Sequence, residues 1–355
     1  MDKPSEPTIV LPGSEAHLVE PPGAAGAPPS GPSQASEEIR EAMDTSRRGA
    51  PSVGEAVSDL FSTDEIFHRL MATADEEFAR SSRLLFLSGL AAGLSIGLTF
   101  LARAAMTGLV GSADGTGLVG NLLYPIGFLF IVLGRYQLYT ENTLTPVTLV
   151  LTRLASLPRL LKIWGIVFAA NLAGAAVAAL LFSQTAVMEP EAREAAYGFG
   201  EHALALAWWP LFFKGMIAGW MVAGMVWLMH AVRDSVARVF LVYFIMFLVP
   251  SLGLFHCVIG ACELFYFVLE GGVGLGEGAA RFLLPVTLGN TVGGVLFVAL
   301  PNYFQTREET FREWVRLSWR EWFWGQRRRP GTPTDTVMTA KKPLLDLRGQ
   351  PSERS

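Results

Sequence analysis

Long uncharged stretches, separated by short charged segments, dominate the middle of the chain. Uncharged runs occupy residues 84–102, 115–134, 163–188, 239–262 and 282–306, and a sixth run, 203–232, carries one charge at Lys214. A helix needs about 20 apolar residues to cross a bilayer. The pattern therefore predicts six membrane-spanning helices within residues 84–306, and an all-α membrane protein.

The two ends of the chain have a different composition. Residues 1–58 are rich in Pro, Ser, Gly, Ala and Glu, which predicts a disordered tail, and no apolar signal segment follows Met1. Residues 59–83 carry apolar side chains at helical spacing, so we expect an amphipathic juxtamembrane helix, lying on the membrane or on the bundle, or else an ordinary helix that faces solvent. Residues 307–329 mix tryptophan with arginine, as interfacial helices do, and residues 330–355 are predicted to be disordered.

Basic residues near the predicted spans are distributed asymmetrically. With the N-terminus inside, the cytoplasmic loops hold most of the arginines and lysines that flank the spans, and the opposite side holds only Arg103, Arg193 and Arg281. Cytoplasmic loops are enriched in Lys and Arg. We therefore expect both termini in the cytoplasm and the chain in a bacterial inner membrane.

Composition and charge narrow the range of functions. The chain is 51% hydrophobic and 17% charged, whereas soluble domains are about 25% charged, so an ordinary soluble enzyme is excluded. A net charge of −4 argues against a nucleic-acid partner. The two cysteines, Cys257 and Cys262, together with His256 and Glu263, are too few ligands for a metal site. We expect no metal, no cofactor and no enzymatic activity.

A weak internal repeat divides the predicted spans into two halves of three. Two glycines four residues apart recur 126 residues later, and an asparagine in the third span recurs 119 residues later in the sixth: Gly89, Gly93, Gly215, Gly219, Asn171 and Asn290. An odd number of spans per half gives the second copy the opposite membrane topology, an arrangement common in transporters. Small residues at this spacing are also ordinary helix-packing material. The matched order favours an inverted 3+3 repeat.

The second span is interrupted by polar residues. After Gly134 the chain continues through a polar stretch to Pro146 and then resumes an apolar run. This predicts a helix broken by a loop at membrane depth, which is tolerated where it is buried in protein or lines a cavity. Arg135 and Glu141 are costly in such a place unless paired. Two interpretations remain open: the two charges pair with each other and hold the loop, or they serve transport.

The fifth span is predicted to break as well. Pro250 removes a backbone donor, Gly253 permits unusual dihedral angles, and His256 follows them. The histidine side chain ordinarily titrates near neutral pH and is rare inside an apolar span, so His256 is a functional candidate, although a neutral structural histidine is the alternative. Lys214 in the fourth span either snorkels to the interface or attracts anions.

These residues together resemble the formate/nitrite transporter family. The resemblance runs in order over residues 80–305. It rests on LYPIGFLFIVLGRYQLYTENT at 123–143, WGIVFAANLAG at 164–174, GMIAGWMVAGMVW at 215–227, GLFHCVIGA at 253–261 and LLPVTLGNTVGG at 283–294. It implies six helices in an aquaporin-like arrangement with helices two and five broken, a pore in each protomer, a homopentamer, and passage of small monovalent anions such as formate or nitrite.

The resemblance also assigns candidate pore residues. By position His256 matches the family's central histidine, Thr140 the loop threonine that faces it, and Tyr124 an aromatic residue near the vestibule. Phe128, Leu138 and Val249 match apolar pore constrictions.

Several positions depart from the family pattern. Gln137 stands where the family has an acidic residue, Arg135 and Glu141 replace small residues, and Phe255 stands where an acid often precedes the histidine. Gly219 and Gly260 replace asparagines, and Lys214 does not match the vestibule lysine. These changes resemble a divergent branch of the family.

Three hypotheses of function follow. In the first, the protein conducts small monovalent weak-acid anions: His256 shares a proton with the anion, because a bare ion in an apolar constriction has a large desolvation cost. In the second, it is a channel for water or a neutral solute in which His256 is structural. In the third, it is a membrane scaffold or sensor that binds partners through its long tails.

Overall fold

The structure is a computed structural model that describes residues 61–111, 117–306 and 316–325. Within these ranges the secondary structure is helical and contains no strand. The expected tails at 1–58 and 330–355, and all of the expected helix at 307–329 except 316–325, lie outside the described residues.

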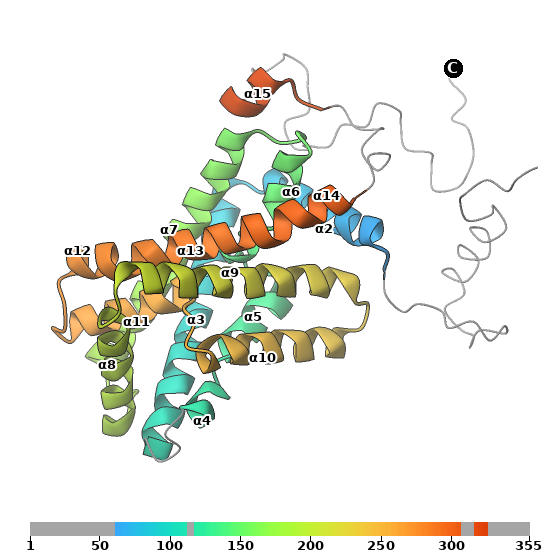
Figure 1. Cartoon of the computed structure of the whole chain (residues 1–355). Coiled ribbons are helices and arrows are strands. Elements are labelled where there is room, and N and C mark those ends of the chain that lie inside the picture. The colour runs from blue at the N-terminus through green and yellow to red at the C-terminus, as the bar shows by residue number, and fades with distance from the viewer. Residues whose placement is uncertain (1–60, 112–116, 307–315, 326–355) are drawn as a thin grey trace, which may run out of the picture. The chain divides into compact units, whose positions relative to one another are not determined.

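Four helices are long and apolar enough to cross a membrane (Figure 1). They are α3 (Ser82–Val110), α7 (Leu157–Gln184), α9 (Trp208–Ala231) and a continuous run, Leu275–Gln305. That run consists of α12 (Leu275–Gly278), η3 (Ala279–Leu283), α13 (Leu284–Gly294), η4 (Val295–Ala299) and α14 (Leu300–Gln305), of which η3 and η4 are π-helical.

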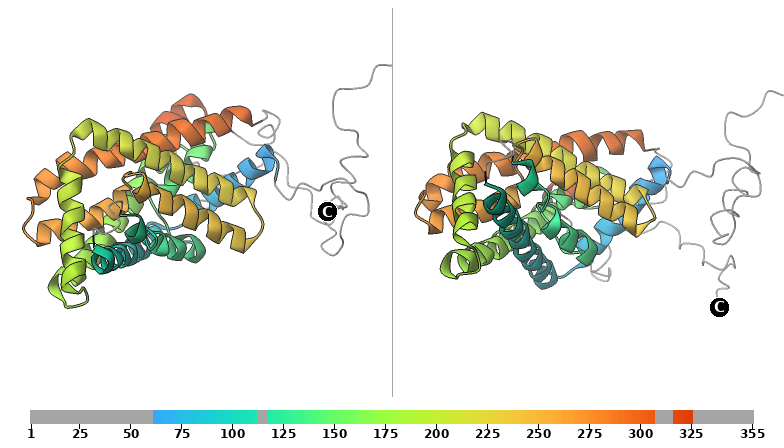
Figure 2. Two further views of the ribbon diagram at one scale, coloured as in Figure 1. Left: turned by 60° about the horizontal axis from the view of Figure 1, so that its bottom comes forward. Right: turned by 90° about the horizontal axis from the view of Figure 1, so that it is seen from below.

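The remaining apolar runs form shorter helices, which Figure 2 shows from two further directions. In the first half these are α4 (Leu118–Asn121), α5 (Ile126–Gly134), η2 (Glu141–Thr143) and α6 (Thr145–Leu151). In the second half they are α10 (Ser235–Ser251) and α11 (Cys257–Leu269). The non-helical links 135–140 and 252–256 lie where the sequence predicts breaks.

The third predicted span differs from the helix that forms. Its uncharged run is 163–188, but α7 begins at Leu157 and ends at Gln184, and a further helix, α8 (Pro190–Leu204), follows. Pro190 occupies the first turn of α8, where a missing backbone donor costs little. The Arg193 side chain donates to the carbonyl of Met188, which stabilises the turn between the two helices.

Glycines allow close helix pairing at two places. A Cβ atom added at Gly93 on α3 would clash with the backbone oxygen of Asn171 on α7, and one added at Gly219 on α9 would clash with the backbone oxygen of Asn290 on α13. Small residues let helix backbones approach each other in this way. These pairings bring both asparagines close to the links at 135–140 and 252–256.

Helix α2 (Thr63–Ala79) packs on the bundle against α6 and α9. Ser62 and Glu65 form a capping box at its start. One face is buried: Ile66, Phe67, Leu70, Met71, Ala74, Glu77 and Phe78. The short helix α15 (Trp319–Trp324) also lies on the bundle, because the Trp322 indole donates to the carbonyl of Val150 at 2.7 Å.

Candidate functional site

One asparagine holds the link between α5 and α6. The Asn171 side chain on α7 donates to the carbonyl oxygens of Gly89, at 2.8 Å, and Gln137, at 2.9 Å. Its own oxygen accepts the backbone N–H of Tyr139 at 2.8 Å. The hydrogen bonds to residues 137 and 139 flank Leu138, so they fix the backbone on both sides of that side chain.

A second asparagine makes the corresponding set of hydrogen bonds. The Asn290 side chain on α13 donates to the carbonyl oxygens of Gly215, at 2.7 Å, and Phe255, at 3.0 Å. Its oxygen accepts the backbone N–H of Cys257 at 2.8 Å. These hydrogen bonds flank His256 as those of Asn171 flank Leu138. Both asparagines are fully buried, and their side-chain amides are satisfied by these backbone groups.

The imidazole of His256 lies between a hydroxyl and an aromatic ring. Its Nε2 shares a hydrogen bond of 2.7 Å with the Thr140 hydroxyl. The ring of Phe128 meets it edge to face, with centroids 5.0 Å apart. The residue is 1% exposed, and its Nδ1 has no hydrogen-bond partner among the described residues. One nitrogen is therefore engaged by protein, and the other is a buried atom without a partner among the described residues.

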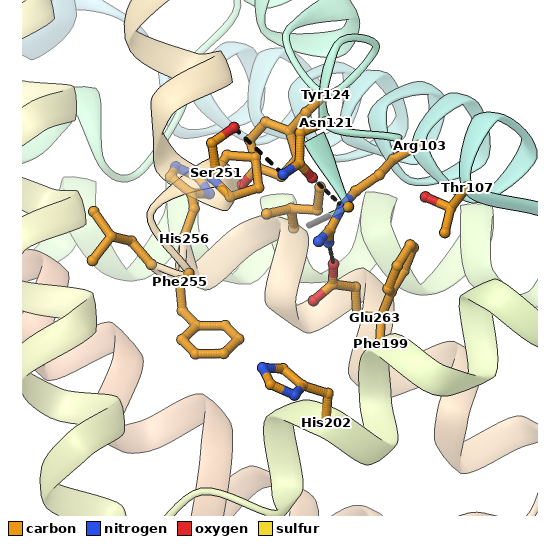
Figure 3. Close-up of a pocket in the computed structure, with 15 residues that line it drawn as sticks. Arg103, Thr107, Asn121, Tyr124, Phe199, His202, Ser251, Phe255, His256 and Glu263 are labelled. Carbon is orange, nitrogen blue, oxygen red and sulfur yellow. Dashed lines mark hydrogen bonds and ion pairs between the residues drawn. The ribbon is translucent and has the colours of Figure 1, made fainter. Parts of the chain in front are cut away.

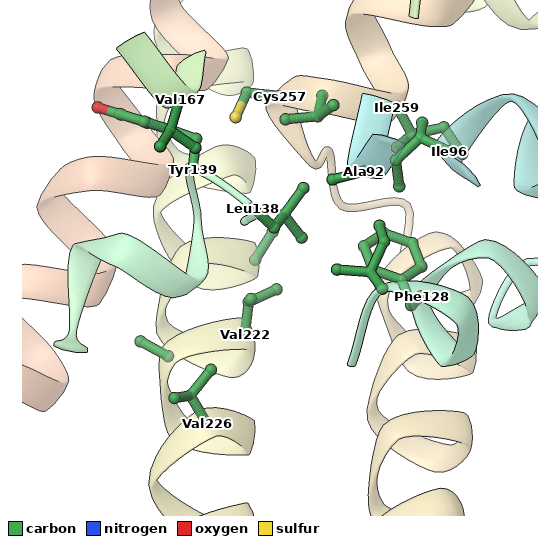
Figure 4. Packing of buried hydrophobic residues seen from close by; sticks show 14 of the residues in the cluster. Ala92, Ile96, Phe128, Leu138, Tyr139, Val167, Val222, Val226, Cys257 and Ile259 are labelled. Carbon is green, nitrogen blue, oxygen red and sulfur yellow. The ribbon is translucent and has the colours of Figure 1, made fainter. Parts of the chain in front are cut away.

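The other candidate pore residues are buried around this histidine. The ring of Tyr124 stacks on Phe128 with centroids 5.6 Å apart. Leu138, Phe128 and Val249 have no exposed surface. Figure 4 shows Leu138 and Phe128 in one buried cluster. The structure thus places Thr140 and Phe128 against His256, with Tyr124 behind Phe128, and buries Leu138 and Val249 in the same hydrophobic core, while their roles in a pore stay predictions.

A cavity of about 290 Å³ lies on one side of His256 (Figure 3). Tyr124 and Glu263 line it, and so does Arg103, whose guanidinium Nη1 donates to the Glu263 carboxylate at 2.8 Å. The Arg103 Nε donates to the Asn121 side-chain oxygen at 3.1 Å. The cavity therefore carries a buried ion pair close to the histidine.

Sequence reasoning did not identify Arg103 or Glu263 as a pair. Arg103 ends the first uncharged run, and Glu263 ends the fifth. Each looked like the boundary of a span, and no spacing rule connects two residues that lie 160 positions apart. One feature of the sequence could have marked Arg103 as unusual: it is one of only three basic residues near the spans on the side expected to face away from the cytoplasm.

Of the two interpretations left open for Arg135 and Glu141, the pairing of these two charges with each other is wrong. Arg135 adopts a left-handed conformation, with φ of 55°, at the end of α5, and its guanidinium pairs with Glu76 on α2 at 2.9 Å. The Arg135 side chain is 68% exposed, so this ion pair contributes little stability. Glu141 is half-buried, and its buried Oε1 has no hydrogen-bond partner among the described residues. The helix end directs Arg135 outward, and the two charges separate.

Lys214 has a structural contact that the sequence did not indicate. Its ammonium donates to the carbonyl oxygen of Gly253 at 2.8 Å. Gly253 has φ of +64°, a conformation that favours glycine. The lysine thus holds the link after α10 in its turned conformation. Its attraction of anions stays a prediction.

Helix α2 carries one carboxyl group, that of Glu77, on its buried face. Glu77 is 5% exposed, and the Thr145 hydroxyl lies 2.9 Å from one of its oxygens and 3.0 Å from the other. Burial raises the pKa of Glu77 to about 7, and the hydrogen bond from Thr145 offsets only part of this effect. The docking of α2 should therefore depend on pH.

We expect the Glu77→Gln variant to remove this pH dependence. A pKa raised from 4.5 to about 7 means that docked α2 favours the protonated acid. The free energy that holds α2 on the bundle therefore becomes less favourable as the pH rises from 4.5 to 7, by about 3 kcal/mol in all. Above pH 7 it falls no further. Glutamine does not titrate. Hydrogen exchange of the α2 backbone amides, corrected for the intrinsic effect of pH, measures the difference.

Glu76→Gln is the matched control because Glu76 neighbours Glu77 in sequence but is 60% exposed. We expect this variant to keep most of the pH dependence of the wild type, because the charge of Glu76 is the smallest of the causes that shift the pKa of Glu77. Equal pH dependence in Glu77→Gln and the wild type would contradict the assignment.

Comparison with known proteins identifies the family. The model of the formate/nitrite transporter family matches residues 64–304, which include α2 and every helix that contributes to the site. The chain belongs to the formate/nitrite transporter family. Its four long apolar helices agree with a multi-pass membrane protein.

Individual relatives are similar to the chain over most of their length. The chain is 29% identical to the inner membrane protein YfdC of Escherichia coli over 246 residues, which is 69% of this chain and 79% of YfdC. It is 25% identical to the formate channel FocA of Haemophilus influenzae over 248 residues, which is 63% of this chain and 87% of FocA.

Solved structures of family members share the fold. An ion channel of the family superposes with a TM-score of 0.61 at 21% identity, over 68% of this chain and 99% of the channel. A pentameric formate channel with formate bound superposes with a TM-score of 0.55 at 21% identity, over 63% of this chain and 96% of that channel.

Proposed function

We propose that the protein is a membrane channel for small monovalent weak-acid anions such as formate or nitrite. The observation that carries the proposal is His256, a buried histidine whose Nε2 is engaged by Thr140 and whose Nδ1 has no partner among the described residues. It lies beside a cavity on one side and apolar side chains on the other. Family membership supports transport rather than catalysis.

The proposed topology has six crossings in an inverted repeat. We assign the crossings to α3, α4–α6, α7, α9, α10–α11 and α12–α14, so that the second and fifth are broken helices. The matched hydrogen bonds of Asn171 around Leu138 and of Asn290 around His256 support this assignment. Each half then presents one link at the middle of the membrane, and the pore runs between the two links.

The proposed mechanism uses a proton to avoid the cost of moving a bare ion. A monovalent anion among Phe128, Leu138 and Val249 has no water shell to stabilise it, whereas the neutral acid needs only hydrogen bonds. His256 meets the acid with Nδ1, sharing a proton with it, while Thr140 orients the ring through Nε2. The neutral acid then passes the apolar residues, and no covalent bond forms.

We also propose that the protein assembles as a homopentamer in a bacterial inner membrane, with both termini in the cytoplasm. The pentameric formate channel with the same fold supports the assembly, and the relative named an inner membrane protein supports the location. Exposed large apolar side chains on α9, including Trp209, Phe213 and Trp220, supply apolar surface for lipid or a neighbouring protomer.

Flux of weak acids into liposomes tests the function. Purified protein is reconstituted, and initial uptake of labelled formate, nitrite, acetate and lactate is measured between about pH 5 and pH 8. Hydrosulfide efflux and osmotic swelling in water and glycerol are measured in parallel. We expect flux of one or more weak acids that rises as the pH falls, because protonation supplies the permeating neutral form.

The outcomes separate the three hypotheses. Swelling without weak-acid flux would favour a channel for water or a neutral solute. A folded oligomer that conducts nothing would overturn the channel assignment and favour the scaffold hypothesis.

A further inference from the structure

An ion pair between Arg103 and Glu263 lies at the wall of the cavity beside His256 (Figure 3). Among the described residues it is the one Arg–Glu pair that lines this cavity. Glu263 is 4% exposed, and the Arg103 side chain is 19% exposed. The guanidinium also lies over the Phe199 ring, 4.0 Å from its centroid. Phe199, Asn121 and Glu263 therefore fix the position of a positive charge at the wall of the cavity.

The chemistry of this pair resembles that of the proposed substrates. Formate and nitrite are planar and present two oxygens that share one negative charge, as the Glu263 carboxylate does. A guanidinium favours such groups because its parallel N–H donors match two oxygens. An oxyanion that enters the cavity therefore competes with Glu263 for Arg103.

Competition between two anions for one cation couples anion binding to a proton. With Glu263 ionised, a bound oxyanion places two negative charges beside one positive charge in a largely buried site, which is unfavourable. Protonation of Glu263 removes one of the negative charges and frees the guanidinium. The cavity connects Glu263 with His256, so the protonated carboxyl group stands close to where the anion is to become neutral.

We propose that Arg103 binds a planar monovalent oxyanion in this cavity and that Glu263 supplies the proton that the resulting acid then shares with Nδ1 of His256. The proposal rests on the weak-acid channel function proposed above. The carboxylate of Glu263 first takes a proton from water in the cavity. Its O–H bond then breaks as the proton moves to the oxyanion, which leaves as the neutral acid, and the regenerated carboxylate pairs again with Arg103. One proton and one anion enter, and one neutral acid leaves toward His256.

The other titratable groups near Glu263 come from several elements. Arg103 belongs to α3, Tyr124 to the segment before α5, His202 to α8 and His256 to the link before α11. Cys262 precedes Glu263 on α11. Further elements also pack on α11. Helix α7 carries its charged residues, Arg159 and Lys162, in its first two turns. Arg281 of η3 pairs with Glu277 of α12 at 2.6 Å. Within the described residues, Arg103 is the one cation that contacts Glu263 directly.

Calorimetric binding in detergent tests the proposal without requiring flux. Formate, nitrite and chloride are titrated into the full-length protein in buffers of different ionisation enthalpy, which reports the protons taken up per anion. We expect formate or nitrite to bind with uptake of about one proton above the pH at which Glu263 ionises. Chloride lacks two coplanar oxygens, so it should bind about tenfold more weakly.

Variants assign the two roles. Glu263→Gln keeps Arg103 and should bind the oxyanion without proton uptake, with affinity at least equal to that of the wild type. Arg103→Gln should lose about tenfold or more in affinity, as expected for a lost hydrogen bond to a charged group. The double variant carries neither charge, which avoids a buried unpaired ion, and should neither bind the oxyanion nor take up a proton.

The exposed pair Arg281 and Glu277 offers a matched control. Arg281→Gln and Glu277→Gln should bind oxyanions and take up protons as the wild type does. Unchanged affinity in Arg103→Gln, or undiminished proton uptake in a folded Glu263→Gln, overturns the proposal.

Uptake by liposomes then separates this proposal from the function that it rests on. In Glu263→Gln the maximal rate of formate uptake should fall with no rise in KM, whereas in Arg103→Gln the KM should rise. If the wild type shows no flux, the proposed channel function is contradicted. The calorimetric measurement of proton-linked anion binding then still decides the roles of Arg103 and Glu263. Wild-type flux with wild-type kinetics in both variants contradicts the roles assigned here and leaves the channel function standing.

Discussion

Replacing His256 with asparagine or alanine is expected to lower weak-acid flux about 100-fold, the contribution typical of a positioned proton donor or acceptor. Both substitutions remove Nδ1, the ring atom without a partner among the described residues. Asparagine keeps a polar group that can bond the Thr140 hydroxyl, so it separates the loss of the titrating ring from the loss of that contact. Alanine also leaves a void beside Phe128. Initial uptake of labelled formate between about pH 5 and pH 8 measures the effect.

A second histidine–threonine pair provides the control. His230, at the end of α9, shares a hydrogen bond of 3.1 Å with Thr73 on α2, away from the cavity beside His256. His230→Asn should leave the flux and its pH dependence close to those of the wild type. An unchanged rate and an unchanged pH profile in both His256 variants would exclude a protonation role for His256.

Replacing Asn290 with leucine is expected to destabilise the protein by about 4 kcal/mol, because three backbone groups lose their partner, two of them in buried hydrogen bonds, and each buried unsatisfied group costs about 1–3 kcal/mol. The groups are the carbonyls of Gly215 and Phe255 and the N–H of Cys257. The midpoint of thermal unfolding in detergent should fall by about 10 °C, at roughly 2–4 °C per kcal/mol for a chain of this size. Asn171→Leu should produce a similar fall, because Asn171 makes the corresponding hydrogen bonds.

Asn302 serves as the control for these substitutions. Its side chain donates to the carbonyl of Val298 within the same continuous helix and is half-buried. Asn302→Ala should therefore shift the midpoint by a small fraction of the expected fall. If Asn290→Leu and Asn171→Leu unfold as close to the wild type as Asn302→Ala does, the two asparagines do not hold the links.

The sequence was most informative where local pattern and chemistry coincide. Uncharged runs of helical length predicted a multi-pass helical protein, and the ordered motifs around Asn171, His256 and Asn290 predicted the family, which the family match confirms. Proline, glycine and polar residues marked 135–140 and 252–256 as interruptions. These features depend on backbone propensity and hydropathy, which act over a few residues and are visible in one chain.

Contacts between distant residues were the part that the sequence did not determine. The pairing of Arg135 with Glu141, six residues apart, was one of two open interpretations, but Arg135 pairs with Glu76, and Glu141 keeps a buried oxygen without a partner among the described residues. The left-handed conformation of Arg135 at the end of α5 sets the direction of its side chain, and the hydropathy pattern does not predict that conformation. Helix α8, with its many polar residues, also went unpredicted.

By itself, the sequence determined the all-helical, apolar character of the chain and the family, because each follows from neighbouring residues or from motifs in order. The tertiary structure alone decided which charges meet. Arg103 reaches Glu263 across 160 residues, and Thr145 reaches Glu77 across 68. A buried charge needs a partner. Helix packing selects that partner, because it brings together helix faces that are far apart in the sequence. The local sequence pattern does not predict which faces meet.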